Sequence, residues 1–448
     1  MIYSSLSILI LVILLLAQAG AIFAWTSPFL VQLTSSDSYI PLDLNEASWI
    51  ASITNIGRFP GAIIGALCIN FWGSKNAVFL TLVIESLGWL FLLATNQVLM
   101  LYICRLLSSI GLGMTFSCFP LYIGEIAHPQ IRGAIVTFAF CGSFIGQIAV
   151  NVIGTYLSVS IGSIVLLIPC LLNIALFIWL PNSPHYLVKI GDFEGAKKAI
   201  NWYRNGDGVE EELDSVQNFV LSSNSKNFTD KMGEFRRPYV AKALIVTMVL
   251  FVLMQISGIN VIIIYMETIL IHGKIGILSS SMAVTLLFAI GALTSLATSN
   301  LIDSFGRRPL LLASSLGVGI SMLMLGTHFL LIDYDIDPSG FQGLLIGAAS
   351  LFMIAVSIGL MPVPSTVLSE IFPTNIRNIA SCLASMLGGI VGFAVTKAYQ
   401  TSVDTIGEAY VFYINAAMIF SAVPFVLFYM PETKGKTLTE IQELLMKT

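Results

Sequence analysis

The two halves of this 448-residue chain carry the same short motifs in the same order. Three motifs recur: a glycine two positions before a basic residue, a Glu-Ile pair with an arginine seven residues after the glutamate, and a proline that ends an apolar run. They begin at Gly73, Glu125 and Pro181 in the first half and at Gly306, Glu370 and Pro431 in the second. The offsets of 233, 245 and 250 residues differ, as expected when helices are duplicated and the loops between them vary. The repeat predicts a chain of two similar helical halves.

The composition indicates a membrane protein. Hydrophobic residues make up 56% of the chain, charged residues only 10%, and the mean hydropathy is +0.88. Soluble domains carry roughly 25% charged residues. Apolar stretches long enough to cross a bilayer, near twenty residues each, occur about twelve times. They are expected at residues 6–31, 47–69, 77–96, 98–127, 134–157, 161–181, 239–271, 278–302, 310–331, 341–371, 378–402 and 408–430.

The first apolar stretch starts almost at Met1, so a signal peptide is an alternative interpretation. The stretch has no basic residues before it and runs well beyond the roughly 7–15 apolar residues of a signal peptide. We therefore expect a first helix that is retained.

Lysine and arginine are concentrated in one set of loops, above all in residues 182–238. The opposite set carries little more than Lys274 and Lys397. Basic loops stay on the cytosolic side, which predicts that both termini face the cytosol. The expected division is a first half at 1–181, a cytosolic loop with short amphipathic helices at 182–238, a second half at 239–430 and a cytosolic tail at 431–448. Apolar residues at helical spacing from Phe193 to Tyr203 favour such a helix in the loop.

Five motifs in order along the chain resemble the sugar porters of the major facilitator superfamily. They are Pro120-x-Tyr122-x-x-Glu125-x-x-x-Pro129-x-x-Arg132-Gly133, Gln255-x-Ser257-Gly258-Ile259-Asn260, Asp303-x-x-Gly306-Arg307-Arg308, Glu370-Ile371-Phe372-Pro373 and Pro431-Glu432-Thr433-Lys434-Gly435. Trp25-Thr26-Ser27-Pro28 and Ala47-Ser48-Trp49-Ile50 resemble the insect branch that includes facilitated trehalose transporters. The resemblance implies an all-α membrane protein of about twelve transmembrane helices in two pseudo-symmetric six-helix halves, with the substrate near the midplane between them.

Sugar binding requires uncharged groups that both donate and accept hydrogen bonds, and amide side chains do both. Gln255 and Asn260 lie on either side of Ser257-Gly258, a pair that can loosen a helix and turn both amides towards one ligand. The resemblance favours sugar contact for these two, and hydrogen bonding between helices is the alternative. For Gln147 and Tyr265 the two roles are equally favoured.

The chain departs from the family at several expected contact positions. Met254 stands where a second glutamine is usual, Ser365 where a tryptophan is usual, Phe140 where many members have glutamine, and Gly388-Gly389 where many have Asn-Trp. Ser365 is kept as a candidate contact. Each hydrogen bond contributes about 0.5–1.5 kcal/mol, so these losses would weaken sugar binding or favour another polyol.

Charged residues near the membrane edge are costly unless they are paired. The resemblance implies that such pairs close the cytosolic side, and simple topological anchoring is the alternative, preferred for Lys75. The candidate gate residues are Arg105, Glu125, Arg132, Asp303, Arg307, Arg308, Glu370, Arg377 and Glu432. The first half has uncharged Asn70, Ser74 and Asn182 at positions where the family usually carries charge.

Residues 6–31 contain no Asp or Glu, whereas proton-driven relatives carry an aspartate in the first helix. Glu85 is an isolated acid within an apolar stretch, and we interpret it as structural. No phosphate-binding loop is present and the four histidines are scattered, so neither ATP drive nor an enzyme is favoured. We expect facilitated diffusion of trehalose or a hexose by alternating access. The alternatives are a proton-coupled symporter and a transport-poor sugar sensor.

The expected partners are a small sugar and the lipid bilayer, without cofactor, metal or nucleic acid. The six cysteines all fall in apolar stretches, which favours buried free thiols over disulfides. We expect a monomer in the plasma membrane.

Overall fold

The computed structural model describes residues 2–35, 38–127, 132–204, 208–224, 233–436 and 438–447. Within this part of the chain all regular elements are helical. The first half contains α1 (Ile2–Ala24), α2 (Thr26–Leu33), α3 (Leu44–Ile56), α4 (Arg58–Leu93), α5 (Val98–Ile126), α6 (Arg132–Tyr156) and α7 (Val159–Trp179). The second half contains α12 (Pro238–Ile256), α13 (Ile259–His272), α14 (Ser280–Phe305), α15 (Arg307–Asp333), α16 (Gln342–Ala355), a π-helical turn (Val356–Leu360), α17 (Val363–Ile371), α18 (Thr374–Ile406), α19 (Glu408–Phe420) and α20 (Ala422–Phe428).

Eleven helical segments among the described residues are long and apolar enough to span a membrane. One of them, residues 44–93, contains 50 residues. A straight helix of that length would measure about 75 Å, more than twice the roughly 30 Å of a bilayer core. This segment bends at Gly73, so it accounts for two crossings, and the expected set of about twelve spans is confirmed.

The repeat in the sequence is also a repeat in the backbone. Gly73 has φ 82° and ψ 166°, and Gly306 has φ 91° and ψ 172°. Positive φ of this kind favours glycine, because other residues meet a steric penalty there. Each glycine redirects the chain from one long helix into the next. The expected loop between the spans 47–69 and 77–96 is therefore a turn at a single residue.

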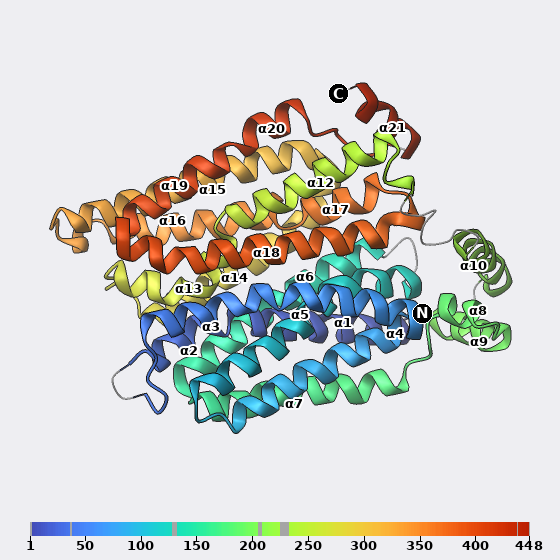
Figure 1. Cartoon of the computed structure of the whole chain (residues 1–448), viewed down its shortest axis with the longest axis horizontal. Helices are drawn as coiled ribbons and strands as arrows, with labels where there is room; N and C mark the ends of the chain where they lie inside the picture. Colours follow the sequence, from blue (N-terminus) through green and yellow to red (C-terminus); the bar gives the residue numbers. More distant parts are fainter. Residues whose placement is uncertain are drawn as a thin grey trace.

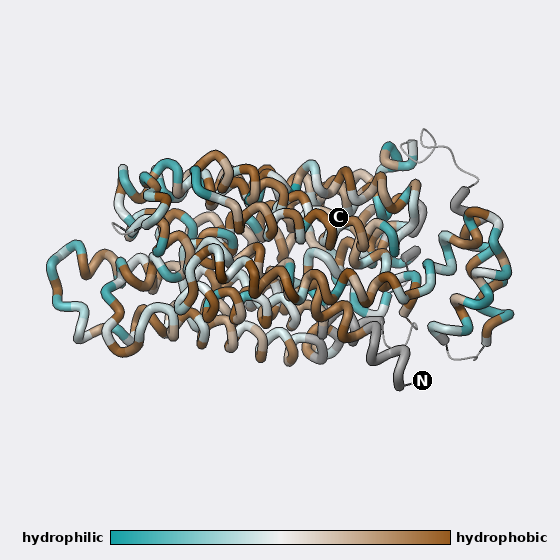
Figure 2. The backbone as a smooth tube through the Cα atoms, turned by 90° about the horizontal axis from the view of Figure 1, so that it is seen from below, coloured by the Kyte–Doolittle hydropathy of each residue, from teal (hydrophilic) through white to brown (hydrophobic). Residues whose placement is uncertain are grey.

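Figure 1 shows the halves as two groups of long helices, with the blue-to-teal first half below the yellow-to-red second half. They meet where α6 packs on α14, α3 and α4 pack on α18, and α2 packs on α13. Hydrophobic residues line the length of the bundle, and hydrophilic residues gather at its two ends (Figure 2). This distribution is typical of a multi-pass membrane protein.

Three short helices follow the first half: α8 (Pro184–Lys189), α9 (Phe193–Arg204) and α10 (Val209–Asn224). They lie at one end of the bundle, where α1 begins and the C-terminal α21 (Leu438–Lys447) also lies (Figure 1). We call this the basic end, after the lysines and arginines of its loops. The amphipathic helix expected from Phe193 is confirmed as α9, with Ala196, Ile200 and Tyr203 buried.

The helix in which a break was expected is interrupted as predicted. α12 ends at Ile256, Gly258 has φ 81°, and α13 begins at Ile259. The first half has a milder interruption at Trp25, between α1 and α2. Both interrupted helices contribute residues to the contact between the halves, because α13 packs on α1 and α2.

Candidate functional site

The break between α12 and α13 brings the two predicted amides together. Asn260 Nδ2 donates a hydrogen bond of 2.5 Å to Gln255 Oε1, and both side chains are buried. Gln255 Nε2 has no hydrogen-bond partner among the described atoms. Asn260 thus orients Gln255, and one buried amide donor is left available for a ligand.

Glycines of α18 make room for these amides. A Cβ atom at Gly388 would lie 3.2 Å from Gln255 Nε2, and one at Gly392 would lie 2.6 Å from Asn260 Nδ2. A larger side chain at Gly392 would displace the amide. At Gly388-Gly389, where many family members have Asn-Trp, the backbone of α18 thus closely approaches Gln255 and the backbone of Asn55.

Two further polar residues reach the same place from the first half. Asn55 Nδ2 donates to Thr396 Oγ1 on α18 at 3.1 Å, and Arg58 Nη1 lies 3.5 Å from Asn55 Oδ1. A Cβ at Gly392 would lie 3.0 Å from Asn55 Oδ1, so Asn55 and Asn260 face the same glycine. We call Asn55, Arg58, Gln255, Asn260 and Thr396 the central polar cluster. Asn55 and Arg58 were missed in the sequence, although each is a polar residue inside an apolar stretch.

The other predicted substrate contacts lie outside this cluster. Gln147 is buried on α6 and its Oε1 has no partner among the described atoms. Tyr265 is buried on α13, with its ring centroid 4.9 Å from that of Tyr399. Ser365 on α17 is exposed, and no described contact joins it to Gln255 or Asn260. Substrate contact by these three residues stays a prediction.

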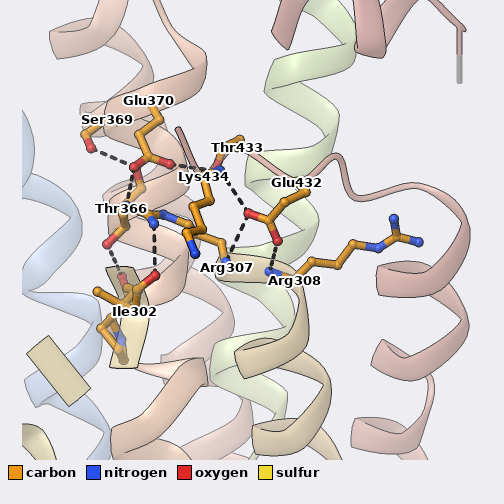
Figure 3. A network of polar contacts seen from close by, with 10 residues as sticks. Ile302, Arg307, Arg308, Thr366, Ser369, Glu370, Glu432, Thr433 and Lys434 are labelled. Atoms are coloured by element: carbon orange, nitrogen blue, oxygen red, sulfur yellow. Dashed lines mark hydrogen bonds and ion pairs between the residues drawn. The ribbon is translucent and has the colours of Figure 1, made fainter. Parts of the chain in front are cut away.

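A network of polar contacts joins helices of the second half at the basic end (Figure 3). Arg307 Nη2 donates to Glu370 Oε1 at 2.7 Å, and Thr433 Oγ1 donates to Glu370 Oε2 at 2.5 Å. Arg307 also donates to the carbonyl of Ile302 at 2.9 Å. The network ties α14, α15, α17 and the segment after α20 together.

Glu432 caps the first turn of α15. Its carboxylate accepts from the backbone N–H groups of Arg307 (3.1 Å), Arg308 (3.0 Å) and Lys434 (2.9 Å). A carboxylate is favoured at a helix N-terminus, where the N–H groups are unpaired and the helix dipole is positive. Partial burial raises the pKa of Glu432, but its backbone hydrogen bonds outweigh burial and the pKa is lowered. Arg308 points the other way, to the carbonyls of Val426 (3.0 Å) and Leu427 at the end of α20.

The first half repeats this arrangement with two hydroxyl groups around its glutamate. Glu125 accepts from the hydroxyls of Ser74 and Ser183, at the positions that Arg307 and Thr433 occupy in the second half. Lys75 Nζ donates to the carbonyl of Leu180 at 2.5 Å, as Arg308 does to the end of α20. Two serine hydroxyls therefore hold Glu125, whereas a guanidinium and a threonine hydroxyl hold Glu370.

Arg105, another predicted gate residue, lies away from this network. Arg105 donates to the carbonyl of Ile22 (3.1 Å) and to the hydroxyls of Thr26 (3.1 Å) and Thr54 (2.6 Å), and its guanidinium lies 4.7 Å from the Trp25 ring centroid. Its expected place in the cytosolic gate is corrected, because these contacts hold it inside the first half near the α1–α2 break. Arg377 donates to the carbonyl of Phe372 at 3.2 Å. The side chains of Arg132 and Asp303 lie outside the described residues.

Several hydrogen bonds between the halves lie at the end opposite the basic end, where α6 ends and α14 begins. Asn151 Nδ2 donates to the Ser281 carbonyl and to Thr285 Oγ1, both at 2.9 Å. Lys397 Nζ donates to Asn45 Oδ1 at 3.0 Å and lies 4.3 Å from the Trp49 ring centroid. The Arg307–Glu370 ion pair lies within the second half, and a cytosolic ion pair between the halves stays a prediction.

Within the described residues, no group of three or more His, Cys, Asp or Glu side chains is placed to hold a metal ion. The central polar cluster itself offers hydrogen bonding by amides, a hydroxyl and one guanidinium.

Comparisons with known proteins identify the family of the chain. The family described as "Sugar (and other) transporter" matches residues 20–445. The facilitated trehalose transporter Tret1 of Drosophila virilis is 30% identical over 435 residues, which cover 95% of this chain and 47% of that protein. The Tret1 of Bombyx mori is 27% identical over 431 residues, covering 95% of this chain and 83% of that protein. The chain spans about half the length of the Drosophila relatives that it matches.

Solved structures of major facilitator proteins share the fold. The proton:xylose symporter XylE bound to 6-bromo-6-deoxy-D-glucose has a TM-score of 0.79 at 22% identity, covering 98% of both chains. A partially occluded inward-open form of XylE from E. coli has a TM-score of 0.81 at 20% identity, covering 97% of this chain and 99% of that one. At these identities the likeness establishes the fold alone, and that fold is the two-halved, all-α architecture expected from the sequence.

Proposed function

Because the chain belongs to the sugar (and other) transporter family, we propose that it carries trehalose or a hexose across a membrane by facilitated diffusion. The carrier would work by alternating access, with the sugar bound between the two halves and each end of the bundle opening in turn. The names of the Tret1 relatives support both the cargo class and the facilitated mode.

The observation that carries the proposal is the central polar cluster. It joins both halves through Asn55 and Thr396, and it leaves Gln255 Nε2 buried without a partner. An unpaired buried donor costs about 1–3 kcal/mol, and a sugar hydroxyl would remove that cost. A bound sugar would then contact both halves at once, as alternating access requires.

The absence of an acid from α1 supports uniport. In the helix Ile2–Ala24 the buried polar residue Gln18 donates to the Leu166 carbonyl at 3.3 Å and accepts from Trp89 Nε1 at 3.1 Å. This pairing is neutral and complete. Arg105, close to the end of α1, likewise takes neutral partners.

One observation favours proton-coupled symport as a second candidate. Glu85 on α4 is buried, its Oε1 accepts from Thr115 Oγ1 at 2.9 Å, and its Oε2 has no partner among the described atoms. Buried acids inside membranes are often proton carriers. We still favour a structural role, because Glu85 faces Gly111 and Thr115 of α5 and no described contact joins it to the central polar cluster.

The test is counterflow of labelled trehalose, glucose and other hexoses in proteoliposomes that contain the purified chain. Saturable counterflow of at least one of these sugars is expected. Saturable binding without flux would favour the sugar sensor over the transporter. Neither binding nor flux of any sugar in the panel would refute the proposal.

We also propose that the basic end faces the cytosol and that the protein is a monomer in the plasma membrane. Figure 1 places α1, α8–α10 and α21 at one end, and the positive-inside rule assigns that end to the cytosol. Epitope tags at either terminus should be detected only after permeabilisation of intact cells. Detection without permeabilisation would reverse the orientation.

A further inference from the structure

Arg58 is a buried cation without an anionic partner. It begins α4 and is 7% exposed. Its contacts are the 3.5 Å approach to Asn55 Oδ1 and the face of Phe116, whose ring centroid lies 5.1 Å from the guanidinium carbon. Within the described part of the chain no carboxylate pairs with it. Arginine stays protonated in proteins, so this charge is present at the centre of the bundle.

Arg105 provides the comparison within the same half. It is also buried, but three hydrogen bonds and the Trp25 ring occupy its guanidinium. All three hydrogen bonds are donated by Arg105 Nη2, and its Nε has no partner among the described atoms. Arg58 has one long contact to an amide and a ring, although a buried charge is costly unless it is paired. The difference indicates that a partner of Arg58 comes from outside the chain.

The position of Arg58 defines what that partner is. Arg58 contacts Asn55, which donates to Thr396 and faces Gly392 beside Asn260. A Cβ atom at Gly389 would lie 3.6 Å from the Arg58 Cβ. The guanidinium thus borders the same glycine face of α18 as the amides Gln255 and Asn260. A ligand that reaches Arg58 from this cluster needs hydroxyls for the amides and an anionic group for the guanidinium.

We propose that Arg58 makes the central polar cluster selective for a hexose that carries one carboxylate, such as a uronate. This inference rests on the proposed function and narrows its cargo class. The planar guanidinium matches a carboxylate and can donate two parallel hydrogen bonds to it. The hydroxyls of the same ring would take the free donor of Gln255.

The number of charges favours a carboxylate over a phosphate ester. A phosphate monoester carries about −1.5 to −2 at neutral pH, whereas one guanidinium balances a single negative charge. The other cations near the centre and the opposite end, Arg105 and Lys397, are held by their own partners. A sugar phosphate would leave buried negative charge uncompensated.

The experiment compares D-glucose, D-glucuronate and D-glucose 6-phosphate, which share one ring and differ in charge. Binding is measured by the ligand-induced thermal shift of the purified full chain, and transport by counterflow in proteoliposomes. D-Glucuronate should half-saturate at a concentration at least ten-fold lower than D-glucose, about 1.4 kcal/mol in binding free energy. Arg58→Gln should remove this preference, and Arg58→Lys should keep part of it.

The matched control is Arg236→Gln, which removes one positive charge from an exposed residue before α12. It should leave the ratio of the two half-saturating concentrations unchanged. Glucose counterflow that glucuronate does not inhibit would overturn the inference and leave the proposed function intact. Tight glucuronate binding without flux of any sugar would support the inference and count against a transporter. Glucose 6-phosphate that binds as tightly as glucuronate would overturn the choice of a carboxylate.

Discussion

Gln255 and Asn260 are five residues apart, yet their side chains share a hydrogen bond. In a regular helix two such positions point about 140° apart, because each residue advances by about 100°. The left-handed Gly258 between them changes that relation and directs both amides to the glycines of α18. A single backbone conformation thus converts two amides of one helix into a paired binding element.

Replacing either amide should weaken sugar binding. Gln255→Ala removes the free donor and the acceptor of Asn260, and Asn260→Ala removes the group that orients Gln255. Each should raise the half-saturating sugar concentration several-fold or more, since a buried polar contact contributes about 1–3 kcal/mol. Uptake kinetics at equal surface level measure the effect. Gln97→Ala, at an exposed residue before α5, is the control. Unchanged kinetics in both cluster variants would exclude this site.

Glu432 attaches residues 430–436 to the start of α15, and this attachment should weaken only at low pH. Its pKa is lowered in the folded state, so its stabilising effect is fully present above the ordinary value for glutamate, about 4.3. The effect is lost as the pH falls through the lowered folded value. The contacts of Arg307, Arg308 and Lys434 should therefore survive mild acidification to pH 5.

Hydrogen exchange of residues 430–436 measures this attachment. Protection should be the same at pH 7 and pH 5 after correction for the intrinsic exchange rate. Glu432→Gln should reduce protection at both pH values, because a neutral amide loses the interaction with the helix N-terminus, about 0.3–2 kcal/mol. Protection that is lost between pH 7 and pH 5 in the parent would contradict the lowered pKa.

At the scale of elements, the two halves hold the same helix ends with different chemistry. In the second half Glu370 pairs with Arg307, whose side chain is only 9% exposed. In the first half Glu125 accepts from two serine hydroxyls. A neutral replacement of the glutamate therefore removes the negative charge beside a buried guanidinium in one half, whereas in the other half it only changes the acceptor of two hydroxyls.

Glu370→Gln should consequently destabilise the protein more than Glu125→Gln. Breaking a partly buried ion pair from one side costs up to about 3–5 kcal/mol, whereas exchanging one acceptor for another at a hydroxyl costs about 0.5–1.5 kcal/mol or less. The measurement is the thermal unfolding temperature of the two variants in the same detergent. Equal shifts would show that the charge of the Arg307–Glu370 pair contributes nothing beyond its hydrogen bonds.

For the whole molecule, the conformational state depends on contacts between the halves. The described hydrogen bonds from Asn151 to Ser281 and Thr285, and from Lys397 to Asn45, join the two halves at the end opposite the basic end. Opening that end requires these bonds to break. Residues far from the central polar cluster therefore control which side of the membrane the cluster faces.

Asn151→Ala should shift the population towards the form that is open opposite the basic end. The variant removes the three hydrogen bonds of Asn151 Nδ2 to Ser281 and Thr285 of α14, each of about 0.5–1.5 kcal/mol, which is sufficient to change a two-state ratio several-fold. A reporter cysteine is placed between the central polar cluster and the end opposite the basic end, in a variant without the six native cysteines. It should react with a thiol reagent faster in Asn151→Ala than in the parent. Asn76→Ala, at a residue whose Nδ2 bonds only within its own helix, is the control. Equal labelling rates in the parent and Asn151→Ala would refute the prediction that the hydrogen bonds of Asn151 favour the form in which this end is closed.

The mode of energy coupling is also a property of the whole chain. With neutral pairing around Gln18 in α1, sugar uptake into vesicles should reach the external concentration and stop there. A proton ionophore should leave the initial rate unchanged. Accumulation of sugar well above the external concentration under an inward proton gradient would establish symport. Loss of that accumulation in Glu85→Gln would identify Glu85 as the proton-carrying residue.

The sequence by itself determined the features that depend on one element at a time. Apolar length predicted the spans, the repeated Gly73 and Gly306 motifs predicted two similar halves, and Ser257-Gly258 predicted the broken helix. These features are local, because hydrophobic length, positive φ and helix breaking are set by neighbouring residues. The candidate amides Gln255 and Asn260 were found for the same reason, since the break and both side chains lie in one short segment.

The tertiary structure alone decided which distant residues meet. Asn55 and Thr396 are 341 positions apart, and neither they nor Arg58 could be assigned to the cluster from patterns within one helix. The structure also placed Arg105 away from the predicted gate and showed the hydrogen bonds from Asn151 and Lys397 that join the halves. Such contacts depend on how rigid helices pack against one another. The energy of that packing is shared by many residues of both halves, so no single stretch of sequence encodes it.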